Sequence, residues 1–194
     1  FAARMSACAI GPGLSTHGET VHVVKDLVRA LSVPMVIDAD GVNALDGSLD
    51  ILKNVKAPVV MTPHPGEMAR LLGVTSADVQ RDRIAVAKGF AERYGVTLVL
   101  KGAGTVIATP TGEVFINTTG NPGMATAGTG DVLTGMIGSL LAQGYGPTAA
   151  ACLGVCVHGI SGDLAVKEKG EAAMIAGDLI ETIPAALKEI NLEP

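Results

Sequence analysis

The segment 117–135 combines glycines and small polar residues with a single acid, and an apolar helical pattern begins at Val132. Gly128 and Gly130 can adopt backbone angles that are closed to residues with a Cβ atom, and they let a ligand approach the chain closely. The first turn of a helix carries free N–H groups and the positive end of the helix dipole, which together favour a phosphate. Asp131, at the start of this helix, could take a proton from a hydroxyl group that attacks the phosphate. The segment predicts an anion-binding loop beside a catalytic base; a glycine-rich turn with an acid that stabilises the helix N-terminus is the alternative.

A second loop with phosphate-binding chemistry is Lys101-Gly-Ala-Gly-Thr105, which interrupts two β-rich segments. Its two glycines would let the backbone lie along the phosphates or the ribose of a nucleotide, and Lys101 would add a point charge. A β-hairpin turn with an exposed lysine is the alternative interpretation.

The run Pro63-His64-Pro65-Gly66-Glu67 holds a histidine rigidly between two prolines, where a buried strand is expected to end. We expect His64 to contact a substrate and Glu67 to order a metal-bound water. The same residues also fit a structural hydrogen bond from the histidine and an acid favoured by a helix dipole.

Asp38 and Asp40 follow another predicted strand, and their carboxylates point the same way if the strand continues that far. Paired carboxylates suit a hydrated Mg²⁺ ion, whereas an Asx turn before Asn43 explains them equally well. As metal ligands, acting through water, we select Asp40 and Glu67. The sequence around His158 is not distinctive, and we expect a surface or core residue there.

Alternating strands and helices must position these residues. Strands are predicted at 6–10, 34–38, 59–62, 97–101, 105–108 and 114–117, and helices at 19–31, 67–72, 77–94, 131–143, 147–166 and 176–190. This order predicts a three-layer α/β/α fold with a mainly parallel central sheet. Ligands in such folds bind beyond the carboxyl ends of the strands, so the candidate clusters are expected to meet in one crevice.

The composition indicates a single globular domain over residues 1–194, with 48% hydrophobic and 17% charged residues. The mean hydropathy of +0.42 is high, but no uninterrupted apolar stretch reaches the ~20 residues that a membrane-spanning helix needs. The net charge of −5 and the absence of Trp argue against a nucleic-acid partner. The odd number of cysteines, three, predicts reduced thiols and a cytoplasmic location.

Taken together, the motifs resemble the ADP/ATP-dependent NAD(P)H-hydrate dehydratase family, which has a ribokinase-like fold. The matching segments are 11–13, 38–45, 62–67, 101–105 and 121–131, in the family's order and spacing over nearly the whole chain. Other ribokinase-like kinases share the Gly-Thr-Gly-Asp turn, but they usually carry an asparagine at the position of His64.

The resemblance implies that hydrated NADH or NADPH is dehydrated at the expense of ADP or ATP, with Mg²⁺, in a homo-oligomer such as a tetramer. Bacterial members typically use ADP. The residues implied for the nucleotide are Lys101, Gly102, Ala103, Gly104, Thr105, Asn121, Gly128, Thr129 and Gly130. Those implied for the hydrate are Gly13, His64 and Asp131.

The residue chemistry fits this reaction. Asp131 would take the proton of the C6 hydroxyl group as its oxygen attacks the terminal phosphorus, and phosphate would then leave far more readily than hydroxide. Two departures stand out: Ala127 replaces a glycine of many relatives, and the family's N-terminal segment is expected to be absent. A ribokinase-like kinase of a small vitamin-precursor alcohol and a non-catalytic nucleotide-binding fragment are the alternative functions.

Overall fold

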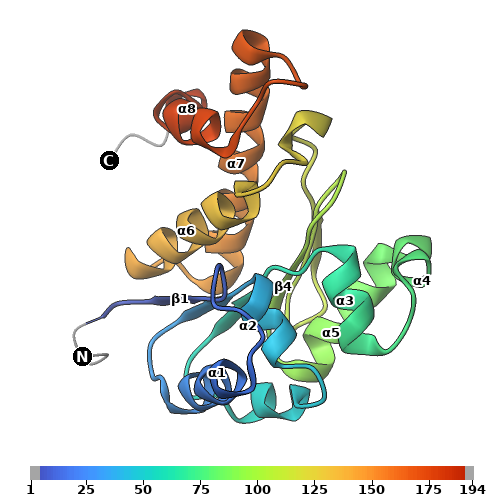
Figure 1. Cartoon of the computed structure of the whole chain (residues 1–194). Coiled ribbons are helices and arrows are strands. Elements are labelled where there is room, and N and C mark those ends of the chain that lie inside the picture. Colours follow the sequence, from blue (N-terminus) through green and yellow to red (C-terminus); the bar gives the residue numbers. More distant parts are fainter. Residues whose placement is uncertain (1–4, 191–194) are drawn as a thin grey trace.

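Within residues 5–190, which the computed structural model describes, the chain forms a six-stranded sheet between two layers of helices (Figure 1). The strands, which lie side by side in chain order, are β1 (Cys8–Ile10), β2 (Met35–Ile37), β3 (Val59–Met61), β4 (Thr97–Leu100), β5 (Val106–Ala108) and β6 (Val114–Ile116). The first four strands are parallel, and β5 and β6 continue the sheet in antiparallel pairs. The predicted mainly parallel sheet is confirmed.

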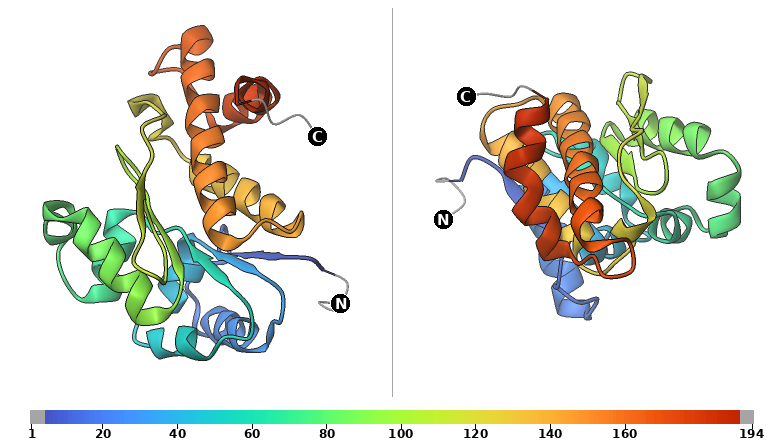
Figure 2. Two further views of the ribbon diagram at one scale, coloured as in Figure 1. Left: turned by 180° about the vertical axis from the view of Figure 1, so that it is seen from behind. Right: turned by 90° about the horizontal axis from the view of Figure 1, so that it is seen from above.

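Helices cover both faces of this sheet (Figure 2). The first face carries α1 (Gly18–Ala30), α2 (Ala39–Ala44), η2 (Leu49–Asn54), α3 (Pro65–Leu72), α4 (Ser76–Arg81) and α5 (Arg83–Tyr94). The second face carries α6 (Thr129–Ala142) and α7 (Pro147–Lys169), with α8 (Ala176–Glu189) packed on α7 and η3 (Pro122–Met124) in the preceding loop. The predicted three-layer arrangement is therefore confirmed.

The central strands are buried on both faces, which explains their continuous apolar sequence. In β2, Met35 and Ile37 join the core beneath α1 and α3, whereas Val36 between them joins the core beneath α6 and α7. The alternation of side chains along a strand thus fills two separate cores from one sheet.

The helix predicted over 77–94 is two helices, and the single-helix prediction was wrong. Asp82 has an extended-type φ of −149° and its carboxylate accepts a hydrogen bond from the N–H of Ala85 at 2.9 Å. An aspartate in this conformation begins a new helix, because its side chain replaces a missing backbone acceptor. The end at Gly95 is as expected, with the left-handed φ of +68° that favours glycine.

α7 is the one helix in the described part of the chain that is long and apolar enough to cross a membrane. It packs against β3, β4 and β5 on one side and against α6 and α8 on others. Its apolar composition is explained by this packing, because a helix covered on several sides has few positions for charged residues.

The parallel strands bring their following loops to one edge of the sheet. Backbone hydrogen bonds continue the pairing past the strand ends: Asp38 N–H donates to Ile10 at 3.0 Å, Thr62 N–H to Ile37 at 3.1 Å, and Lys101 N–H to Pro63 at 2.9 Å. The loops that carry the candidate clusters therefore lie along one edge of the sheet.

Candidate functional site

A cavity of about 700 Å³ opens at this edge, between the loop after β4 and the N-terminus of α6. Its walls are residues 101–105, most of the segment 117–126, and side chains from α6 and α7. The volume is in the range of small-molecule and cofactor sites.

Most residues predicted to hold a nucleotide line this cavity. They are Lys101, Gly102, Ala103, Gly104, Thr105, Asn121, Thr129 and Gly130, whereas Gly128 does not line it. Of the residues predicted to face the second substrate, His64 lines the cavity, and Gly13 and Asp131 do not. The two predicted metal ligands, Asp40 and Glu67, also lie outside its lining.

The loop 101–105 is shaped by glycines and anchored by an arginine. Gly102 has a φ of +141° and Gly104 a φ of +62°, conformations that side chains rarely adopt. Arg83, at the start of α5, donates hydrogen bonds to the carbonyls of Leu100 at 2.9 Å and Ala103 at 2.6 Å. Burial lowers the pKa of this guanidinium, which remains the loop's charged anchor. Sequence reasoning missed Arg83, because its contacts are about twenty residues distant along the chain.

We expect Arg83→Met to lower the free energy of unfolding by about 2 kcal/mol, because two hydrogen bonds from a charged donor are lost. ADP binding, measured by calorimetry, should weaken about tenfold as the loop loosens, which corresponds to about 1.4 kcal/mol. Arg81→Met is the matched control, since Arg81 only pairs with Asp78 on the surface. An unchanged ADP affinity in Arg83→Met would show that the anchor does not shape the cavity.

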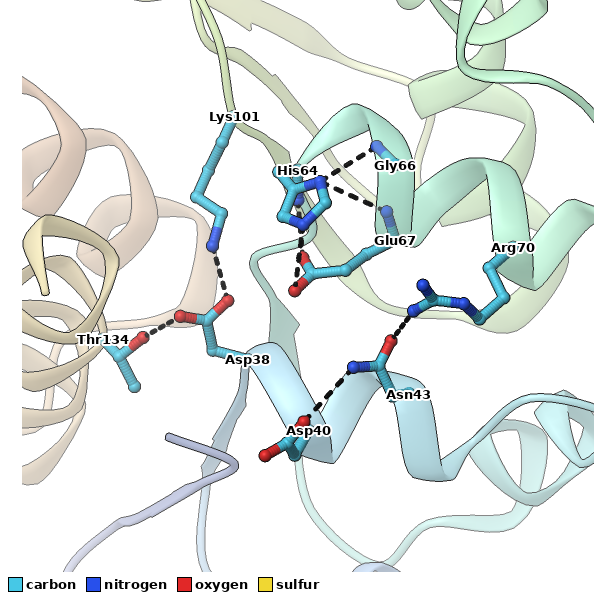
Figure 3. A network of polar contacts seen from close by, with 9 residues as sticks. All are labelled: Asp38, Asp40, Asn43, His64, Gly66, Glu67, Arg70, Lys101 and Thr134. Carbon is cyan, nitrogen blue, oxygen red and sulfur yellow. Dashed lines mark hydrogen bonds and ion pairs between the residues drawn. The ribbon is translucent and has the colours of Figure 1, made fainter. Parts of the chain in front are cut away.

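A partly buried ion pair lies beside the cavity and joins three segments of the chain (Figure 3). The Nζ atom of Lys101 lies 2.7 Å from Oδ1 of Asp38, whose side chain is 1% exposed, and Thr134 of α6 donates to Oδ2 at 2.8 Å. The two carboxylate oxygens are therefore each satisfied, as a buried charge requires. Asp38 and Asp40 were expected to point the same way if the strand continued that far; it does not, because the chain turns at Ala39, with a φ of +47°, and α2 begins there.

The N-terminus of α6 offers free donors beside this pair. Gly128 has a φ of +87°, as expected for a glycine-dependent turn, whereas Gly130 is helical and needs no unusual angle. The N–H groups of Gly130 and Asp131 have no acceptor within residues 5–190. A Cβ atom at Gly130 would lie 3.4 Å from Nζ of Lys101 and 3.6 Å from Oδ2 of Asp38, so the start of α6 lies beside the ion pair and its ammonium group. This geometry suits an anion.

Asp131 is exposed in the first turn of α6. Its carboxylate takes part in no hydrogen bond or ion pair with another residue of the described part of the chain. Thr129 differs, because its hydroxyl group donates to the carbonyls of Met124 at 2.8 Å and Thr126 at 2.9 Å. Thr129 thus holds the turn together, and its hydroxyl proton is already engaged within the protein.

Asn121 is also occupied within the protein. Its amide group donates to Asp163 of α7 at 3.0 Å, and its oxygen accepts from the N–H of Gly123 at 3.1 Å. Asp163 also accepts from the N–H of Gly120 at 2.8 Å. The loop over the cavity is thereby fixed to α7, and Asp163 is a second anchor that the sequence did not reveal.

His64 and Glu67 cap α3 and each other. Nδ1 of His64 accepts from the N–H groups of Gly66 at 2.9 Å and Glu67 at 3.3 Å, and Glu67 accepts from the N–H of His64 at 2.7 Å. The two residues thus form a capping box, which is the structural alternative given above for His64 and Glu67. The imidazole remains half exposed at the cavity, whereas the Glu67 carboxylate is 7% exposed.

The loop that contains Gly13 contacts Asp40 at a neighbouring point of the same edge. The turn at Gly13, with a φ of +72°, leads to Ser15, whose N–H donates to Oδ2 of Asp40 at 2.8 Å. Asn43 lies 3.4 Å from the other oxygen. Within residues 5–190, no three His, Cys, Asp or Glu residues are grouped as a metal site.

His158 is the residue whose position sequence reasoning missed most clearly. It lines the cavity from α7, is 9% exposed, and its Nε2 atom lies 2.9 Å from the carbonyl oxygen of Thr129. Burial, with a smaller contribution from the charge of Lys101, lowers the pKa of His158 to about 4. The imidazole is therefore neutral at pH 7.

This shift predicts that stability falls as the pH is lowered. Between the usual histidine pKa of about 6.5 and the folded value of about 4, the unfolded chain binds a proton that the folded chain does not. The free energy of unfolding should therefore lose about 2 kcal/mol between pH 7 and pH 5 through His158 alone. Urea unfolding of the wild type and His158→Gln at both pH values measures this difference. Equal pH dependence of the two proteins would contradict the prediction.

Comparisons with known proteins agree with this geometry. A family model described as NAD(P)H-hydrate dehydratase matches residues 1–185. The chain is 51% identical over 191 residues to the bifunctional NAD(P)H-hydrate repair enzyme Nnr of Moorella thermoacetica, covering 98% of this chain and 36% of that protein. It is 42% identical over 175 residues to the ADP-dependent (S)-NAD(P)H-hydrate dehydratase of Neisseria meningitidis, covering 89% of this chain and 58% of that protein.

A solved structure is similar as well. The ADP/ATP-dependent NAD(P)H-hydrate dehydratase from Bacillus subtilis, co-crystallised with ATP/Mg²⁺, matches with a TM-score of 0.85 and 36% identity. The match covers 98% of this chain and 69% of that one. The fold is the ribokinase-like one, as the motifs predicted. The chain thus spans about a third of the bifunctional relative and somewhat more than half of the dehydratase.

Proposed function

Because the chain belongs to the NAD(P)H-hydrate dehydratase family, we propose that it dehydrates the hydrated forms of NADH and NADPH in a nucleotide-dependent reaction. The nucleotide would be ADP, yielding AMP and phosphate, or ATP. The observation that carries the proposal is the cavity that is lined by Lys101, by the glycine loop and by Gly130, whose N–H group is free at the start of α6. No single one of these features would select a nucleotide, but their combination supplies sites for its phosphates and space for the remainder.

We assign the phosphates to the N–H groups of Gly130 and Asp131 and to Nζ of Lys101. The amides are fixed by α6 and the ammonium group is held by Asp38, so both are already oriented when the nucleotide arrives. Donors that need no reorganisation stabilise the charge that develops on a transferring phosphoryl group. The loop 101–105 would lie along the rest of the nucleotide.

Asp131 is proposed as the base. Its exposed carboxylate would remove the proton of the C6 hydroxyl group while that oxygen forms a bond to the terminal phosphorus and the anhydride bond breaks. The ring nitrogen then expels phosphate from C6, and loss of a proton from the adjacent carbon restores the double bond of the dihydronicotinamide. His64 and Gly13 would contact the hydrate from the same edge of the sheet.

Mg²⁺ is part of the proposal, in a largely hydrated form. The available oxygens fit only such an ion, because Asp40 and Glu67 already accept hydrogen bonds and no three ligands converge within residues 5–190. Mg²⁺ commonly keeps several waters and is bound by one or two carboxylates together with substrate phosphates. When bound, it would neutralise charge on the phosphates, with Asp40 and Glu67 contacting its waters.

We place the reaction in the cytoplasm and propose a homo-oligomer, which light scattering can test. The function is tested by incubating the protein with hydrated NADH and Mg²⁺, with either ADP or ATP. The expected result is a rise in reduced-nicotinamide absorbance with one phosphate released per molecule formed. Accumulation of a phosphorylated hydrate would instead indicate a kinase, and nucleotide binding without turnover would indicate a binding module.

A further inference from the structure

The cavity wall contains a buried imidazole that the proposed reaction does not use. His158 projects from α7 and is 9% exposed, next to the first turn of α6. A buried histidine can be a core residue whose two nitrogen atoms are satisfied. The hydrogen bonds of the ring decide between that case and a ligand contact.

The partner of Nε2 fixes the tautomer. Nε2 lies 2.9 Å from the carbonyl oxygen of Thr129, and a carbonyl oxygen can only accept. Nε2 must therefore carry the hydrogen atom, which leaves Nδ1 of a neutral ring as an acceptor. The low pKa of about 4, caused mainly by burial, keeps the ring in this state at pH 7.

Nδ1 itself has no hydrogen-bond partner within residues 5–190. The fully buried side-chain nitrogen and oxygen atoms without a partner belong to Thr62, Arg83 and Ser161 in the described residues. Nδ1 of His158 is not one of these atoms, so it is not fully buried. Nδ1 is therefore accessible on a residue that lines the cavity, which places it within reach of a ligand there. An acceptor in this position favours a ligand that brings a donor.

The donor cannot be a phosphate group. Phosphate oxygens are acceptors at neutral pH, and two lone pairs facing each other repel. The phosphates already have donors in the amides of α6 and in Lys101. On a nucleotide, the remaining donors are an exocyclic amino group and the ribose hydroxyl groups.

We propose that His158 is a specificity-determining residue that accepts, through Nδ1, a hydrogen bond from an amino or hydroxyl donor of the nucleotide. This inference rests on the proposed function, because it assumes that a nucleotide occupies the cavity. It goes beyond that function by assigning selection of the nucleotide to a residue on α7.

The test is calorimetric binding of four ligands: ADP, IDP, 2′-deoxy-ADP and 3′-deoxy-ADP. The wild type should bind one analogue about tenfold more weakly than ADP, the amount expected for one lost hydrogen bond. Weak binding of IDP, which lacks the amino group, identifies that group as the donor. Weak binding of a deoxy analogue identifies a hydroxyl group.

Two variants of His158 distinguish a role in nucleotide selection from a purely structural role. His158→Gln can still donate to the Thr129 carbonyl but lacks the Nδ1 acceptor. It should therefore bind ADP and the weakly bound analogue with about equal affinity. His158→Asn keeps an acceptor near Nδ1 and should retain much of the preference, with lower stability. His17→Gln is the control, because His17 is exposed at the start of α1 and should behave as wild type.

The inference is overturned if His158→Gln binds ADP and keeps the full preference of the wild type. It is also overturned if ADP binding takes up a proton that His158→Gln does not take up, because the ring would then be a cation that donates to a phosphate. If the wild type binds neither these four ligands nor ATP, the proposed function fails together with the inference. If the wild type binds ADP but binds all four ligands equally well, only the inference is overturned.

Discussion

Replacing Asp131 with asparagine is expected to lower the rate of dehydration at least about a hundredfold, the usual contribution of a positioned general base. Asparagine has the same shape but cannot take a proton. ADP affinity should change by less than about twofold, because the proposed phosphate contacts use backbone N–H groups that the substitution leaves in place. Initial rates of NADH formation and calorimetric ADP binding measure the two quantities separately.

Glu19→Gln is the matched control for this variant. Glu19 is an exposed acid in the first turn of α1, remote from the cavity lining. Both substitutions remove a negative charge near a helix N-terminus, which costs about 0.3–1 kcal/mol of stability. If Asp131→Asn turned over hydrated NADH at the wild-type rate, the assignment of the base would be wrong.

Lys101→Met is expected to have the second large effect, on binding and on stability together. It removes the ammonium group near the phosphate site and leaves the carboxylate of Asp38 buried without its counter-ion. Removing one partner of a buried pair costs about 3–5 kcal/mol. ADP affinity should fall at least about tenfold, because a charge-assisted contact to phosphate is lost.

The double variant Asp38→Asn/Lys101→Met separates the two effects. It no longer buries a charge, so its free energy of unfolding should return to within about 1 kcal/mol of the wild type. ADP affinity should stay low, because the ammonium group is still missing. Urea unfolding and calorimetry measure this cycle, and recovery of ADP affinity in the double variant would show that Lys101 acts only through the structure.

The sequence predicted the frame of the site because the frame depends on local signals. Short apolar runs gave the buried strands, and glycines marked the loops at positions such as Gly102 and Gly128, where the backbone has a positive φ. Since parallel strands end at one edge, the meeting of these loops followed from the strand order. The split of the 77–94 helix was missed because one N-capping aspartate, Asp82, outweighed a continuous amphipathic pattern.

The contacts inside the site could not be predicted, because they join residues that are distant in the chain. Asp38 and Lys101 are 63 positions apart, and Asp38 and Thr134 are 96 apart. Nothing near Asp38 distinguishes a carboxylate that binds a lysine from one that binds a metal. Only the fold decides which opposite charge reaches it.

The sequence after His158 contains a weak indication that this residue lies at the wall of a site. Gly159 and Gly162 follow it on α7, and a Cβ atom at these positions would lie 2.0 Å from Thr119 and 2.3 Å from Met124. Such glycines inside a helix indicate close approach of another segment, here the loop over the cavity. A histidine beside them is therefore a candidate for the wall of a site.

The most direct test of the central claim is a crystal structure of the chain with ADP bound. We predict that the terminal phosphate lies within hydrogen-bonding distance of the N–H groups of Gly130 and Asp131 and of Nζ of Lys101. ADP seated instead in a second hollow, around Lys53 and Tyr94, would contradict it.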